Sequence, residues 1–127
     1  MSRHGDFLYL HHIVDACYKI TQYTSGLDAG AFASSNLVQD AVIRQLEIIG
    51  EASNRVSKLF QMEHQEIPWA EMRGLRNVLI HDYPSVVPSI VWGIAKNDLP
   101  GLLENLNRII TPQQDFRREE PDPTHDR

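Results

Sequence analysis

An arginine, a histidine and a tyrosine lie within eight residues of one another in this sequence. Arg76 is followed by His81 and then by Tyr83, with Pro84 directly after them. Arginine carries a planar fork of N–H donors that matches the oxygens of a phosphate group. Histidine has an ordinary pKa that lets it act as an acid or a base near neutral pH. The combination therefore indicates phosphoryl chemistry.

These residues lie at the end of a segment with helical periodicity, residues 68–83. At about 100° per residue, Arg73, Arg76 and Tyr83 share one face of a regular helix. His81 lies about 140° round the axis from Arg76. One regular helix therefore does not bring the arginine and the histidine together. Either its last turn unwinds, or a second copy of the motif completes the site.

Two polar neighbours have candidate supporting roles. Asn77 precedes His81 by four residues, so its amide can hydrogen-bond the imidazole and fix its tautomer. Asp82 can orient an imidazole, or it is a solvated surface acid. On the residues alone, Tyr83 packs its ring against the end of the bundle and points its hydroxyl at water.

Helical spacing recurs along the rest of the chain, and no strand-like alternation persists. We expect further helices over residues 7–25, 36–59 and 88–110, with a kink or short break at 97–101 in the last of them. Asp28 suits the N-cap of a short turn. The sequence therefore predicts an all-α protein, an up-and-down four-helix bundle with short loops.

Length and composition fit one globular domain. The chain has 127 residues, of which 42% are hydrophobic and 23% charged. Residues 1–112 are predicted as the helical domain, and residues 113–127 as a disordered polar tail. Cys17 is the only cysteine, so no intrachain disulfide forms and a reducing cytoplasm is the expected location. The polar start does not resemble a signal peptide, and no apolar run has the length of a membrane span.

The formal net charge of −5 opposes broad nucleic-acid binding. Residues 113–127 carry five acids and three arginines, so −2 lies in the tail and −3 in the body. We therefore expect a narrow basic cleft on an acidic body. Its existence depends on whether five cations of the body share a face: Arg44, Arg55, Lys58, Arg73 and Arg76.

The order and spacing of the residues in the motif are more specific than its composition. Arg76, four residues, His81, any residue and Tyr83 resemble the pattern of the HEPN superfamily, and the surroundings resemble its HepT-like toxins. The supporting segments are residues 40–44, 47–52, 68–77, 91–92 and 98–100. The likeness extends over residues 5 to 111.

The resemblance implies a metal-independent ribonuclease that uses Arg76 and His81 in a cleft between two protomers of a homodimer. RNA would be cleaved by attack of the neighbouring 2′-hydroxyl on phosphorus, without a cofactor. The resemblance also implies a partner, a minimal nucleotidyltransferase antitoxin of the MntA type, which transfers AMP from ATP to Tyr83. A bulky anion at this tyrosine would block the phosphate of RNA.

Other clusters favour structural interpretations. His11 and His12 diverge on a helix, and His64 has no ligand partner at metal spacing, so no metal site is predicted. Glu47 and Glu51, flanked by arginines, indicate either a surface ion network or a wall of the RNA cleft. Trp69 and Trp92 are predicted as core or dimer contacts, and Cys17 as a buried, unreactive thiol. The rival function is a helical module that binds a nucleotide or the nucleotidyltransferase without catalysis.

Overall fold

The computed structural model of the chain describes the backbone of residues 3–81 and 87–119, and the side chains of residues 5–75 and 87–112. Every element in these ranges is a helix, which confirms the predicted all-α class. In chain order the elements are α1 (Arg3–Thr24), α2 (Ala29–Ala33), α3 (Asn36–Arg55), α4 (Lys58–Glu63), α5 (Trp69–His81), α6 (Pro88–Gly93), the π-helical turn η1 (Ile94–Asp98) and α7 (Leu99–Glu119).

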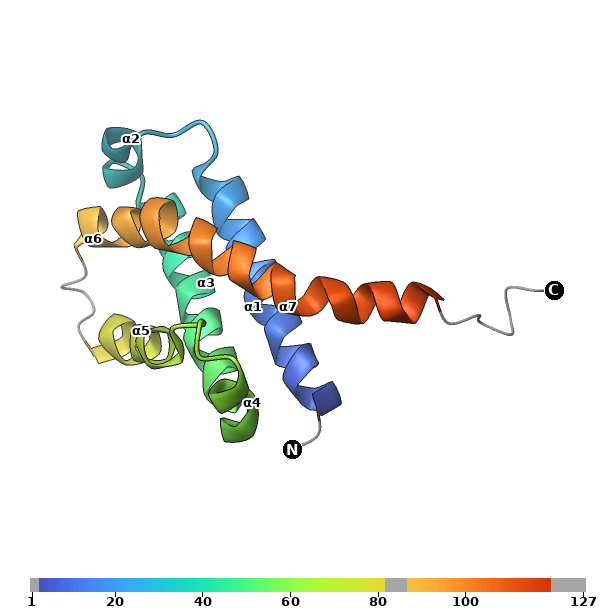
Figure 1. Cartoon of the computed structure of the whole chain (residues 1–127). Helices are drawn as coiled ribbons and strands as arrows, with labels where there is room; N and C mark the ends of the chain where they lie inside the picture. The colour runs from blue at the N-terminus through green and yellow to red at the C-terminus, as the bar shows by residue number, and fades with distance from the viewer. Residues whose placement is uncertain (1–2, 82–86, 120–127) are drawn as a thin grey trace.

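The long helices form a bundle around one core. Helix α3 packs against α1 on one side and against α5 on the other, and α7 crosses α1 (Figure 1). Helix α6, η1 and α7 follow one another without a loop and act as the fourth helical segment. The centre of the core consists of fully buried aliphatic and aromatic side chains: Leu10, Ile13, Ile20, Phe32, Val42, Leu46, Ile49, Phe60 and Leu106.

The predicted second helix, 36–59, is in fact two helices. Helix α3 ends at Arg55, and Ser57 caps the start of α4 by accepting a hydrogen bond from the backbone N–H of Phe60 at 3.2 Å. The buried carboxylate of Asp6 accepts hydrogen bonds from both the backbone N–H and the hydroxyl of Ser57, each at 2.8 Å. This contact with α1 holds the chain in a turn where the apolar periodicity alone predicted a continuous helix.

The cap predicted at Asp28 is confirmed. Asp28 accepts from the backbone N–H of Ala31 at 2.8 Å and caps α2, as expected. Helix α3 is capped by Ser35, and the side chain of Gln39 donates to the carbonyls of Phe32 and Ala33.

The break expected at residues 97–101 starts three residues earlier, as the turn η1 (Ile94–Asp98). The N–H of Leu99 bonds to the carbonyl of Ile94, five residues back, which is π-helical geometry. Pro100 has no N–H to continue the regular ladder, so the extra residue is accommodated just before it.

Helix α7 continues through Pro112 to Glu119, beyond the predicted domain boundary at residue 112. Among the side chains of α7 that the structure describes, which end at Pro112, Ile110 is the last that is buried against the bundle. The division into a domain and a tail remains a prediction, and residues 120–127 lie outside the described residues. No helix in the described part of the chain is long and apolar enough to span a membrane.

Candidate functional site

Helix α5 carries the first part of the predicted motif. It starts after Pro68, whose carbonyl accepts from the N–H of Met72 at 3.1 Å. Trp69 and Met72 are buried, and the indole N–H of Trp69 donates to the carbonyl of His64 at 2.9 Å. These contacts fix the start of α5 against the core and thereby set the direction in which the helix runs.

The backbone of α5 stays helical through His81. Positions 76 and 81 therefore lie about 140° apart round the axis, and the rest of the last turn, residues 82–83, lies outside the described residues. The side chains of Arg76, Asn77 and His81 are outside the described set, and Asp82 and Tyr83 lie outside the described residues altogether. The contacts of these five predicted site residues thus remain predictions.

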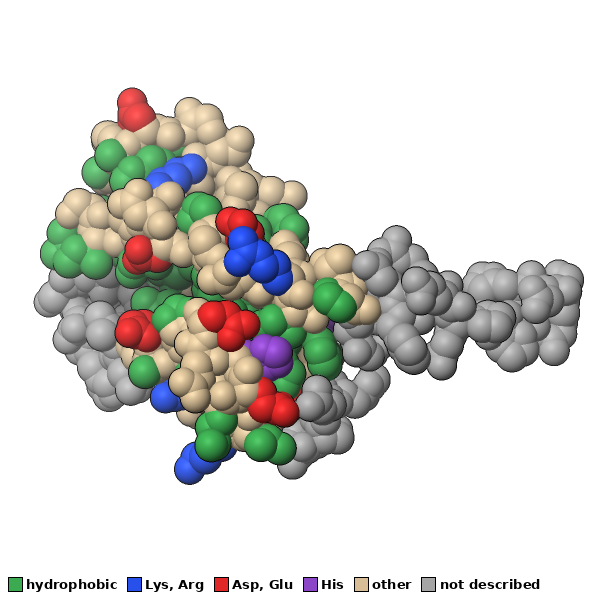
Figure 2. Space-filling view, in the orientation of Figure 1, with side chains coloured by type: hydrophobic (Ala, Val, Ile, Leu, Met, Phe, Trp, Pro, Cys, Tyr) green, Lys and Arg blue, Asp and Glu red, His purple; other side chains and the backbone are tan. Residues whose placement is uncertain are grey.

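Arg73, the other predicted site residue, sits one turn before position 76. Its Nη1 donates to Oε1 of Gln61 on α4 at 2.6 Å. Both residues line an open groove of about 830 Å³ between the end of α3, helix α4 and the start of α5, together with Lys58. Basic side chains are visible at the lower end of the molecule, where α4 and α5 lie in this orientation (Figure 2).

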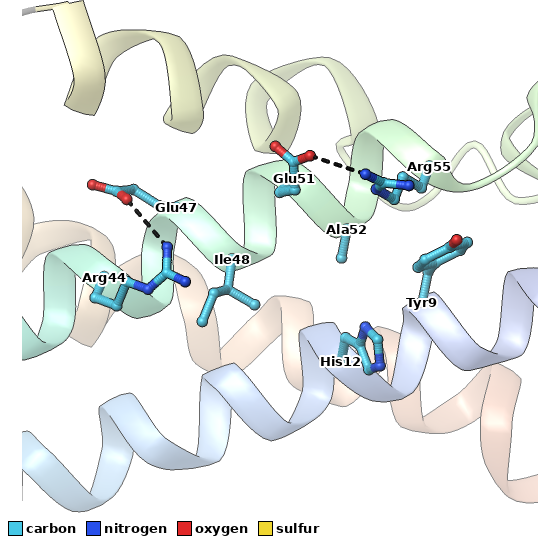
Figure 3. Close-up of a pocket in the computed structure, with 8 residues that line it drawn as sticks. All are labelled: Tyr9, His12, Arg44, Glu47, Ile48, Glu51, Ala52 and Arg55. Carbon is cyan, nitrogen blue, oxygen red and sulfur yellow. Dashed lines mark ion pairs between the residues drawn. The ribbon is translucent and has the colours of Figure 1, made fainter.

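A second groove, of about 560 Å³, lies between α1 and α3. Arg44 pairs with Glu47 at 3.6 Å and Arg55 pairs with Glu51 at 3.5 Å, all on α3, while Tyr9 and His12 approach from α1 (Figure 3). The ion pairs expected between these glutamates and arginines are present, and the alternative role as a wall of the RNA cleft stays a prediction.

Four of the five cations expected to share a face are thus divided between two grooves, and the fifth, Arg76, lies outside the described side chains. Arg44 and Arg55 line the α1–α3 groove, whereas Lys58 and Arg73 line the groove between α4 and α5. The arginines of the first groove are balanced by glutamates on their own helix. Glu66 and Glu71 also line the second groove, but neither Lys58 nor Arg73 forms an ion pair with a described carboxylate, so this groove is the better candidate for binding an anion.

His64 and Cys17 have structural surroundings. Within the described ranges, no three His, Cys, Asp or Glu side chains come together as a metal site. The ring of His64 packs on Phe60, with centroids 4.4 Å apart, and its Nδ1 lies 3.6 Å from Glu66. Cys17 is buried as predicted, and burial raises the pKa of its thiol to about 12, which keeps it protonated and unreactive near neutral pH.

Two tryptophans predicted as core or dimer contacts also have defined partners. Trp69 is buried and meets Phe60 edge to face, with centroids 6.3 Å apart. Trp92 is half-buried between Phe32, at 5.2 Å, and the ammonium of Lys96, 5.0 Å from the ring centre. Trp69 is therefore a core residue, and Trp92 packs at the surface between α2 and η1.

Gln61 is the polar partner that sequence reasoning missed. A signal was available, because Arg73 has no acid three or four residues away on α5, where Arg44, Arg55 and Arg108 each have a glutamate at that spacing. An arginine without a local acid must find its partner on another element or face solvent.

Comparison with known proteins adds independent information. Residues 13–109 match the sequence family described as ribonuclease HepT-like. A Methanocaldococcus jannaschii protein named "Putative RNase MJ1380" is 37% identical over 109 residues, which cover 86% of this chain and all of that protein. A Thermococcus cleftensis protein named "Probable ribonuclease HepT" is 42% identical over 101 residues, covering 80% of this chain and 92% of that protein. No solved structure matches the chain.

Proposed function

Because the chain belongs to the HepT-like ribonuclease family, we propose that it is a metal-independent endoribonuclease, the toxin of a toxin–antitoxin pair. The observation that carries the proposal is the family's match over residues 13–109 together with Arg76 and His81 on α5. An acid–base imidazole and a guanidinium are the groups that cleavage of a phosphodiester needs.

The reaction uses the RNA itself as the nucleophile. The 2′-oxygen attacks the adjacent phosphorus while a His81 imidazole takes its proton. The bond from phosphorus to the 5′-oxygen then breaks, and an imidazolium gives this oxygen a proton. The products are a 2′,3′-cyclic phosphate and a free 5′-hydroxyl. Arg76 offsets the negative charge that develops on the phosphorane, and Arg73, Asn77 and Asp82 have auxiliary roles.

Two copies of the motif are needed for this scheme. One histidine can serve only as base or as acid at a given moment, and positions 76 and 81 diverge by about 140° on the continuous helix α5. A homodimer with facing motifs supplies two imidazoles and two guanidiniums to one phosphate. In sedimentation, the protein should therefore be at least a dimer at micromolar concentration, and a fully active monomer would contradict this part of the proposal.

Neutralisation is proposed to act at Tyr83. The antitoxin, a nucleotidyltransferase of the MntA type, transfers AMP from ATP to the phenol oxygen and releases pyrophosphate. The added phosphate competes with RNA for the arginines of α5. Incubation with the partner, ATP and Mg²⁺ should add adenylyl mass to the parent and none to Tyr83→Phe. Unchanged cleavage by the labelled protein would instead indicate simple occlusion by the partner.

The deciding experiment is a ribonuclease assay on the purified chain. Cleavage should survive EDTA, fail on a substrate with a 2′-deoxy nucleotide at the scissile position, and disappear in Arg76→Ala and His81→Ala. His12→Ala, which removes an exposed imidazole on α1, is the matched control and should retain activity. Metal-dependent cleavage, or an active His81→Ala, would favour the rival function, a non-catalytic module that binds a nucleotide or the nucleotidyltransferase.

A further inference from the structure

Arg73 differs from the other described arginines in the group that holds its guanidinium. Arg44, Arg55 and Arg108 pair with glutamates on their own helices, at 3.6, 3.5 and 2.6 Å. Arg73 instead donates to the amide oxygen of Gln61 at 2.6 Å. A carboxylate offsets the charge of a guanidinium, whereas a neutral amide fixes its direction and leaves the charge in place. Arg73 is thus oriented without being neutralised.

The amide of Gln61 is itself fixed in orientation. Its Nε2 donates to the carbonyl of Val56 at 2.9 Å and, at 3.5 Å, to that of Ser53, both at the end of α3. Because the amide nitrogen faces these carbonyls, the amide oxygen faces Arg73. The neighbouring Phe60 is 1% exposed and anchors α4 in the core. The guanidinium is therefore held by a chain of contacts that reaches the body of the bundle.

The groove around Arg73 has a second cation. Lys58 is exposed on its wall and has no ion pair among the described side chains. Two glutamates, Glu66 and Glu71, also line the groove, and neither forms an ion pair with Lys58 or Arg73 among the described side chains. Glu66 lies 3.6 Å from Nδ1 of His64, and Glu71, two residues before Arg73, is about 160° round α5 from it.

The groove leads toward the motif. Position 76 follows Arg73 by one turn of α5, about 4.5 Å further along the axis and about 60° round it. An extended polyanion in the groove that contacts Lys58 and Arg73 can therefore continue to the face that carries position 76.

We propose that this groove is a subsite for the backbone of single-stranded RNA flanking the scissile phosphate. Arg73 and Lys58 bind phosphate oxygens, and Gln61 is a positioning residue that acts through Arg73. RNA fits better than a protein surface because the guanidinium retains its charge and its remaining N–H donors, which match phosphate. The assignment rests on the proposed ribonuclease function and adds a location for the substrate beyond the motif.

The test measures binding of a fluorescent single-stranded RNA whose 2′-hydroxyls are methylated, so that it is not cleaved. The dissociation constant is determined at several salt concentrations by anisotropy. Arg73→Gln should bind about tenfold more weakly, and its slope of log K against log [salt] should fall by about 0.7, one phosphate contact on a single strand. Lys58→Gln should change the slope in the same direction. Arg108→Gln makes the same charge change on α7 and should keep the parental slope.

A matched pair of glutamine variants isolates the role of the neutral amide. Like Gln61, Gln39 donates to two backbone carbonyls at the end of a helix, here those of Phe32 and Ala33 in α2, at 2.9 and 3.0 Å. Helix α2 lies at the other end of the molecule from α4 (Figure 1). Gln61→Glu and Gln39→Glu therefore make the same chemical change. Only Gln61→Glu places a carboxylate beside Arg73, so it alone should weaken RNA binding and reduce the salt slope, although both variants lose a similar amount of thermal stability.

The outcomes separate the subsite from the function on which it rests. If the parent cleaves RNA but Arg73→Gln and Lys58→Gln keep its salt slope, the subsite is wrong and the ribonuclease proposal stands. A parent that neither binds nor cleaves RNA overturns both. Variants that bind RNA normally and fail to bind the nucleotidyltransferase would assign the groove to the protein partner and overturn the subsite.

Discussion

The contact between Asp6 and Ser57 should be one of the strongest single polar contributions to the stability of this fold. The carboxylate of Asp6 is 2% exposed and accepts two hydrogen bonds of 2.8 Å from one residue that lies 51 positions away. Asp6→Ala removes both acceptors. Hydrogen bonds to a charged group contribute about 1.5–3 kcal/mol each, and water can reach the freed donors because Ser57 is half-buried. We therefore expect a loss of about 3 kcal/mol.

The measurement is urea or thermal unfolding followed by helical circular dichroism. A loss of about 3 kcal/mol corresponds to a fall in Tm of about 10–15 °C for a chain of this length. Asp15→Ala is the matched control, because Asp15 is an exposed acid on the same helix and its removal should change stability by less than about 0.5 kcal/mol.

A double-mutant cycle identifies the partner. Ser57→Ala removes the hydroxyl contact and the cap of α4, which should cost about 1–2 kcal/mol. Because Asp6 and Ser57 share one of the lost bonds, the double variant should be less destabilised than the sum of the two, by about 1 kcal/mol. Strict additivity of the two stability losses, or an Asp6→Ala variant as stable as the parent, would refute this account of the Asp6–Ser57 contact.

Three further predictions concern packing, backbone conformation and titration. Phe60→Ala should lower the free energy of unfolding by about 3–5 kcal/mol, because the ring is 1% exposed. Leu59→Ala is the control: the side chain of Leu59 is 67% exposed, so its loss should cost less than about 0.5 kcal/mol. Both are measured by urea unfolding. Gly26→Ala should lower Tm, because Gly26 has a φ of 77° and an alanine there pays a conformational penalty of about 1 kcal/mol although its Cβ would meet no atom within 4 Å. Gly101→Ala should raise Tm, because Gly101 lies on α7 and an added Cβ would also meet no atom within 4 Å. Burial raises the pKa of the Cys17 thiol from 9.0 to about 12, so the unfolded chain loses this proton at a lower pH than the folded chain. The free energy of unfolding should therefore fall as pH rises from 9 towards 12. A Cys17→Ala variant measured in parallel should show a shallower fall.

The sequence by itself determined the fold class and indicated the chemistry expected of the motif. Helical periodicity is a local property, so the all-α class follows from the spacing of apolar residues. The cap at Asp28 and the burial of Cys17 could be predicted for the same reason. The spelling of Arg76, His81 and Tyr83 indicated the family that the comparison over residues 13–109 then confirmed.

The sequence also allowed part of the charge arrangement to be predicted. Arg44 with Glu47 and Arg55 with Glu51 lie three or four residues apart, and helix geometry alone places such pairs side by side. By the same rule, Arg73 has no partner on its own helix, because no acid lies three or four residues from it. It does not identify the partner.

Only the tertiary structure decided which residues meet across helices. The break after Arg55 depends on Asp6, a residue of another helix, and the orientation of Arg73 depends on Gln61, so neither follows from periodicity. The division of the cations between two grooves has the same origin. A repeating pattern fixes the face on which a side chain lies, but the rotation and offset of one helix against the next fix its neighbours, and these are set by the packing of the whole core.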